Sequence, residues 1–181
     1  MRLFAALSPP GDLRDRLVAA QAGLPAGKLV SWENLHLTLA FFGEVDARRA
    51  EDLHAALSRI RAAAFDLDLD GAGAFGSGQT RSLHIAAKRC PALAQLNEKV
   101  ERAAEEAQVK VESGRFTPHV TLARLRPGRA HPARVATWLS GVGAFRAGPY
   151  RTTSFQLYES HLGRSGAIYR EIARYALEDR S

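Results

Sequence analysis

The segment LHLTLAF, residues 35–41, alternates large apolar side chains with His36, Thr38 and a small alanine. A period of two is typical of a β-strand, because successive side chains of a strand point to opposite faces. We expect the apolar face to pack against helices and the polar face to line a cleft. The pattern returns in HVTLA, residues 119–123, which again places a histidine and a threonine on one face. The sequence therefore predicts two equivalent strands whose polar faces can meet.

The composition is that of an ordinary globular protein. Of its 181 residues, 46% are hydrophobic and 24% are charged, which is typical of a soluble chain. The single cysteine, Cys90, allows no internal disulfide and favours the reducing cytoplasm. The apolar run at residues 3–7 meets Pro9 and Pro10, too early for a signal peptide, and no stretch approaches the roughly 20 apolar residues of a membrane span. We expect a cytoplasmic monomer without a membrane partner.

The formal net charge is +6. An excess of Lys and Arg favours polyanionic partners, RNA or DNA above all, through phosphate neutralisation. The alternative is that the charge serves solubility alone.

Strand-like and helix-like segments alternate, and the alternation runs twice. This order favours an α+β protein of two related halves over a parallel doubly wound sheet. No linker divides the chain, so residues 1–181 are expected to form a single two-lobed domain. Strands are expected at residues 3–7, 35–41, 65–70, 81–87, 109–111 and 154–158, helices at 12–20, 46–63, 91–107 and 132–139, a flexible stretch at 71–78, and either a strand or a helix at 168–177.

The repeated phrase points to acid–base chemistry on a phosphate. A lone strand histidine is usually a satisfied core residue, but the duplication favours a catalytic pair, His36 and His119. Histidine has an ordinary pKa of about 6.5, so one imidazole can accept a proton while the other donates one. Thr38 and Thr121 are predicted to contact phosphoryl oxygens through their hydroxyl groups.

The sequence lacks the motifs of other kinds of catalytic site. Cys90 stands alone before Pro91, and the chain has no Gly-x-Ser-x-Gly elbow for a serine nucleophile. His-x-His pairs, His-Glu-x-x-His helices and Cys/His clusters are also missing from the sequence. We therefore expect neither a metal nor a cofactor.

Three further residues are candidates for substrate contact. Arg124 ends the second motif strand and can bind the negative charge that develops on a phosphoryl group. Trp32 precedes the first motif and is suited to stack on a base or to pack at the edge of the core. His84 lies in a predicted strand with apolar neighbours on the opposite face, so it can point into the cleft, and its role is open.

Longer runs around the motifs resemble a known family. They are RLF (2–4), WENLHLTLAFFGEV (32–45), FTPHVTLAR (116–124) and LYES (157–160). Together they are similar to the bacterial and archaeal RNA 2′,3′-cyclic phosphodiesterases, also called 2′-5′ RNA ligases, of the two-histidine phosphoesterase superfamily. The resemblance covers nearly the whole chain.

The resemblance implies a bilobal α+β fold in which two pseudo-symmetric antiparallel sheets face a central cleft, with helices on the outer faces. It implies metal-independent hydrolysis of RNA 2′,3′-cyclic phosphate ends to 2′-phosphates, and reverse 2′-5′ joining of RNA, with tRNA halves as one candidate partner. By position, His36 is the general acid and His119 the general base, with Thr38, Thr121 and Arg124 on the phosphoryl oxygens. His84 departs from the family, which often has another aromatic residue there.

Two alternatives stay open at this point. One is a phosphoesterase for a small cyclic nucleotide or ADP-ribose cyclic phosphate, and the other is a non-catalytic RNA-binding module. Salt dependence separates an RNA substrate from a small one, because binding to RNA weakens steeply as salt is added.

Overall fold

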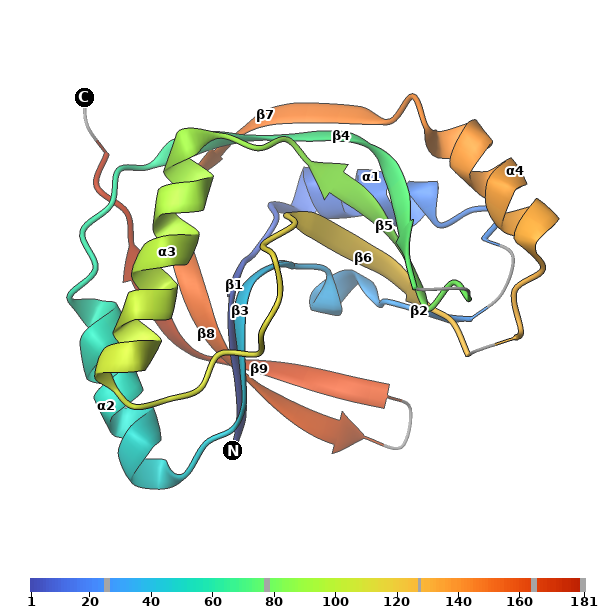
Figure 1. Ribbon diagram of the computed structural model, residues 1–181. Coiled ribbons are helices and arrows are strands. Elements are labelled where there is room, and N and C mark those ends of the chain that lie inside the picture. The colour runs from blue at the N-terminus through green and yellow to red at the C-terminus, as the bar shows by residue number, and fades with distance from the viewer. Residues whose placement is uncertain (25–26, 77–78, 127, 164–165, 180–181) are drawn as a thin grey trace.

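The computed structural model describes residues 1–24, 27–76, 79–126, 128–163 and 166–179. Helices and strands are mixed along the chain, as predicted, although the last three strands follow one another without a helix between them (Figure 1). In chain order the elements are β1 (Arg2–Leu7), α1 (Gly11–Ala20), β2 (Lys28–Leu29), the 3-10 helix η1 (Trp32–Asn34), β3 (Leu37–Glu44), α2 (Ala47–Ser58), β4 (Phe65–Phe75), β5 (Ser82–Ala87), α3 (Pro91–Glu106), β6 (His119–Arg124), α4 (Pro132–Val142), β7 (Arg146–Thr152), β8 (Ser154–Gly163) and β9 (Gly166–Ala176).

The strands form one nine-stranded sheet in the order β7-β4-β5-β6-β3-β1-β8-β9, with β2 paired to β6. The motif strands β3 and β6 are antiparallel neighbours at its middle, joined at Leu37 and Val120. The half β3-β1-β8-β9 lies on one side of this junction and the half β6-β5-β4-β7 on the other. The predicted α+β architecture is confirmed, and the two expected sheets are joined into one through the motif strands.

The two faces of the first motif strand differ as predicted. Leu35, Leu37 and Leu39 are buried in the core, whereas His36 and Thr38 are only half-buried. The helices pack by apolar stripes, because residues spaced three or four apart share one helix face. The buried stripe of α3 consists of Leu93, Leu96, Val100 and Ala103.

Both motif strands contain a bulge at the fourth residue of the motif. Leu39 is passed over in the register between β1 and β3, and Leu122 is passed over in the register between β5 and β6. A bulge disrupts the ladder locally and increases the twist of its strand. Equivalent irregularities therefore shape the two motif strands at equivalent positions.

A buried side-chain amide donates a hydrogen bond to the backbone oxygen of each bulged residue. Asn97 of α3 donates to the oxygen of Leu39 at 2.9 Å, and Gln21, directly after α1, donates to the oxygen of Leu122 at 3.0 Å. These bonds satisfy carbonyl groups that would be costly to bury without a partner.

The same bonds show that the helices cross between the halves. Helix α1 follows β1, a strand of one half, but Gln21 at its end binds β6 in the other half. The last residue of α1 also accepts a hydrogen bond from Trp138 of α4. Helix α3 follows β5 but binds β3, with α2 beside it (Figure 1). Each half is thus covered in part by a helix that follows a strand of the other half.

Three expected local structures are wrong. Residues 109–111 form no strand, because the amide of Val109 bonds to the oxygen of Ala104 and closes the end of α3. Helix α2 ends at Ser58 rather than near residue 63. Residues 71–75, expected to be flexible, continue β4, and residues 72–75 pair with β5. Residues 77–78 of that stretch lie outside the described residues.

Strand pairing decides the open segment at 168–177 and adds two strands that were not expected. The undecided segment at 168–177 belongs to strand β9, which forms a long hairpin with β8. Strands β2 and β7 were not expected, because β2 has two residues and β7 contains Gly148 and Pro149. Proline is tolerated in β7 because this strand lies at the edge of the sheet. In the described part of the chain, no helix combines the length and the apolar character needed to cross a membrane.

Candidate active site

The junction of β3 and β6 brings the two motifs together. Leu37 pairs with Val120 in an antiparallel ladder, and continuing that register sets His36 across from Thr121 and Thr38 across from His119. Because neighbouring residues alternate between faces, these four polar side chains share the face opposite the buried Leu37 and Val120. The four motif residues predicted from the sequence therefore form one cluster.

The ring of His36 is held by one hydrogen bond and by aromatic neighbours. Its Nδ1 lies 2.6 Å from the backbone oxygen of Asn34. A carbonyl oxygen can only accept, so Nδ1 donates and the neutral ring keeps its lone pair at Nε2. Phe4 and Tyr169 lie 4.9 and 5.2 Å from His36 between ring centroids, Tyr169 edge-on. The orientation of His36 is therefore determined before any substrate arrives.

His119 is held by an equivalent hydrogen bond. Its Nδ1 donates to the backbone oxygen of Thr117, also at 2.6 Å and also two residues earlier. Phe75 and His84 lie 4.8 and 4.9 Å from it between ring centroids. Both imidazoles thus leave Nε2 as the nitrogen available for proton exchange.

Burial and nearby positive charge disfavour the protonated form of both rings. Burial lowers the pKa of His36 to about 4, and the charges of Arg124, Arg14 and His119 act in the same direction. The pKa of His119 is lowered by burial and by Arg124. These shifts favour neutral rings at pH 7, and a bound anion would raise the affinity of both rings for protons.

Arg124 lies close enough to both motif histidines for its charge to affect them. It ends β6, is exposed, and its charge acts on both histidines. Arg14 also acts on His36, although its place on α1 carried no local signal in the sequence. Its guanidinium group binds the backbone oxygens of Pro9 and Trp32 and the hydroxyl of Ser8. Arg14 therefore ties α1 to the segment that leads into the first motif.

Trp32 lies on η1 and packs toward α1 rather than with the four motif side chains. Its Nε1 donates to a carboxylate oxygen of Asp15 at 2.8 Å, and the guanidinium carbon of Arg14 lies 5.0 Å from its ring. Its indole is 42% exposed. Stacking of Trp32 on a base stays a prediction.

His84 lies inside the site. It is 5% exposed, stacks on Phe75 at 4.3 Å between centroids, and its Nδ1 has no hydrogen-bond partner among the described residues. Burial and the neighbouring His119 lower the pKa of His84 to about 4. Gly73 lies opposite in β4, where a Cβ atom would come within 2.5 Å of Nε2 of His84. His84 is thus a neutral aromatic wall beside His119.

We predict that His84→Phe retains activity within a few-fold, whereas His84→Ala lowers it about tenfold by leaving His119 unsupported. The pKa of His84 is depressed in the folded state, so the unfolded chain binds protons more readily between pH 6.5 and 4. The associated stability is present above pH 6.5 and is lost as the pH falls toward 4. Denaturant unfolding at pH 7 and pH 4.5 should show a smaller loss in His84→Phe. An inactive, folded His84→Phe would instead require an imidazole at this position.

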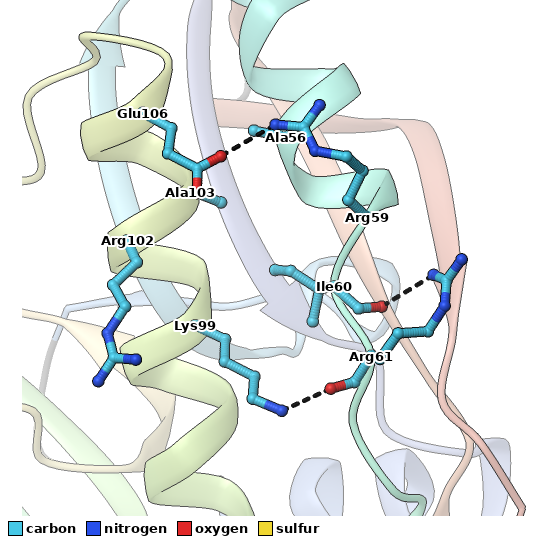
Figure 2. A pocket seen from close by; sticks show the side chains of 8 residues that line it. All are labelled: Ala56, Arg59, Ile60, Arg61, Lys99, Arg102, Ala103 and Glu106. Carbon is cyan, nitrogen blue, oxygen red and sulfur yellow. Dashed lines mark hydrogen bonds and ion pairs between the residues drawn. The ribbon is translucent and has the colours of Figure 1, made fainter.

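A separate hollow of about 290 Å³ lies between α2 and α3 and is rich in cations (Figure 2). Arg59 forms an ion pair with Glu106 at 2.9 Å, and Lys99 donates to the backbone oxygen of Arg61. Arg61 donates to two backbone oxygens at the end of α2. These charges stabilise the end of that helix, and none of the lining residues lies on a motif strand.

The residues described do not form a typical metal centre. Among them, no three His, Cys, Asp or Glu side chains gather closely enough to hold a metal ion. The donors that do gather at the motif strands are imidazoles, hydroxyl groups and a guanidinium group. Such a set can bind a phosphoryl group and move protons around it.

Comparisons with known proteins agree on one family. The family model of the 2′-5′ RNA ligase superfamily matches residues 9–164. An RNA 2′,3′-cyclic phosphodiesterase of Aeropyrum pernix is 35% identical over 162 residues, covering 88% of this chain and 90% of that protein. The Escherichia coli protein of the same name is 32% identical over 180 residues, covering 97% and 96%. The crystal structure of E. coli LigT with 3′-AMP matches with a TM-score of 0.77 and 32% identity, over 97% of this chain and 96% of that chain.

Proposed function

The chain belongs to the 2′-5′ RNA ligase superfamily, and from that premise we propose that it hydrolyses 2′,3′-cyclic phosphate ends of RNA to 2′-phosphate ends without a metal ion. The paired histidines support this proposal, because each is held through Nδ1 by the carbonyl two residues before it. The names of the curated relatives support the same substrate. We also propose that the protein is a cytoplasmic monomer and that tRNA halves are one candidate for its RNA substrate.

The reaction needs one proton acceptor and one proton donor. Nε2 of His119 removes a proton from water, the water oxygen attacks phosphorus, and the bond between phosphorus and the 3′ oxygen breaks. His36 donates a proton to that leaving 3′ oxygen, so the phosphate remains on the 2′ oxygen. Thr38 and Thr121 donate hydrogen bonds to the phosphoryl oxygens, and Arg124 offsets the negative charge that develops there.

The scheme needs one protonated imidazole, so the lowered pKa values of the two rings have to be offset when substrate binds. The negative phosphate favours the protonated form of a nearby imidazole and raises its pKa. In this scheme His36 must hold a proton in the bound state while His119 is neutral, so the phosphate has to raise the pKa of His36 above that of His119. We expect a bell-shaped dependence of the rate on pH.

In the reverse direction, the same site would join RNA ends through a 2′-5′ linkage. The proton donor of hydrolysis must then act as the acceptor, so His36 and His119 exchange roles.

An oligonucleotide that ends in a 2′,3′-cyclic phosphate should be opened in EDTA to a 2′-phosphate end. The product is identified by chromatography against authentic 2′- and 3′-phosphate standards, and an oligonucleotide with a linear 3′-phosphate is the control. Steep loss of binding with added salt would favour RNA over a small substrate. A 3′-phosphate product, or activity that is lost in EDTA and restored by zinc or magnesium, would contradict the proposal.

A further inference from the structure

A groove of about 460 Å³ adjoins the candidate active site. Arg124 lines it, as does Tyr169, whose ring meets His36 edge-on. The groove therefore shares Arg124 with the residues assigned to the phosphoryl group, and its other lining residues include parts of β2 and β9. Its volume lies within the range typical of small-ligand sites.

A second cation lies beside Arg124 in this groove. Lys28 of β2 is the register partner of Arg124 in β6, and directly opposed residues of antiparallel strands have Cα atoms about 4.5–5.5 Å apart. The Lys28 side chain extends toward β9, where a Cβ atom at Gly166 would collide with its ammonium nitrogen. Two cations on long side chains thus stand next to each other along one groove.

The remaining walls of the groove include exposed apolar side chains. Leu29 and Ile168 are 50% and 55% exposed although both are large and apolar. A nucleoside at the end of an RNA chain has flat apolar faces on its base, and its ribose carries a negative phosphate on either side. Cations together with apolar walls fit that chemistry better than they fit a purely ionic ligand.

Building on the proposed function, we propose that this groove binds the terminal nucleoside of the RNA and that Lys28 binds the phosphate on its 5′ side. Arg124 then holds the phosphoryl group at the 2′ and 3′ oxygens of the same nucleoside. This arrangement predicts a preference for RNA ends over nucleosides that lack a 5′-phosphate.

Binding of two product analogues tests the proposal without turnover. Calorimetry compares adenosine 2′-phosphate with adenosine 2′,5′-bisphosphate, which differ by the 5′-phosphate alone. The wild-type protein should bind the bisphosphate about tenfold more tightly, since a charge-assisted hydrogen bond contributes an effect of this order. Lys28→Gln should abolish that gain and leave the affinity for the monophosphate within about twofold, and Lys28→Arg should restore most of it.

Lys110→Gln is the matched control, because it removes one positive charge from an exposed lysine that does not line the groove. It should keep the full gain. Equal binding of the two analogues by the wild-type protein, a gain that persists in Lys28→Gln, or equal losses in both glutamine variants would overturn the role of Lys28. Hydrolysis of the cyclic-ended oligonucleotide is measured separately, so failure of the proposed reaction is distinguishable from failure of the groove.

Discussion

Replacing His36 or His119 by alanine is expected to lower cleavage of a 2′,3′-cyclic-ended oligonucleotide by at least about two orders of magnitude. General acid–base help typically contributes about 10²–10⁴-fold, and each variant removes one of its two partners. The double variant should be little slower than either single variant, because groups that act as a unit have non-additive effects. Rates are measured under single-turnover conditions, so that product release does not mask the loss.

The matched control is His131→Ala, which removes an exposed histidine from the segment before α4. It should cleave at the wild-type rate. Circular dichroism and thermal unfolding establish that each variant is folded, since both motif histidines are half-buried and truncation can lower stability. A folded His36→Ala or His119→Ala protein with an unchanged rate would remove that histidine from the mechanism.

Arg124→Ala should lower the rate about 10²–10³-fold, the size expected when one donor to a developing oxyanion is lost. The effect should fall mainly on kcat, because the charge on the phosphoryl group grows toward the transition state. Arg124→Lys should recover part of the rate, since lysine keeps the charge but not the planar donor pair.

The pH profile gives an independent readout for Arg124. Its positive charge lowers the pKa of both histidines, so Arg124→Ala should raise both pKa values and shift the whole profile to higher pH. Arg126→Ala, which removes an exposed arginine two residues later, should leave both rate and profile unchanged on a short substrate. An Arg124→Ala variant with an unshifted profile would show that Arg124 does not act near the imidazoles.

The sequence correctly predicts features that depend on neighbouring residues alone. The alternation in residues 35–41 correctly separates buried leucines from the half-buried His36 and Thr38. Asp46 caps α2 by accepting a hydrogen bond from the amide of Arg49, as expected for an aspartate before a helix. The prediction that the two motifs meet also holds, because a repeated phrase implies related strands.

Other features depend on contacts between distant parts of the chain. Asn97 in α3 and Gln21 just after α1 look like ordinary polar residues. Only the folded chain shows that they donate hydrogen bonds to bulged residues 58 and 101 positions away in sequence. Lys28 becomes a groove residue only through a strand of two residues that pairs with β6. The pKa of about 4 at His36 likewise reflects burial by aromatic rings drawn from β1 and β9.

The exchange of helices between the halves also restricts how the molecule can move. A two-lobed protein commonly admits ligands by hinge motion, with each lobe turning as a rigid body. Here such a rotation would pull α3 from β3 and α1 from β6 and would expose the backbone oxygens of Leu39 and Leu122, which accept buried amides. We therefore infer a stiff framework in which the two halves do not turn against each other as rigid bodies.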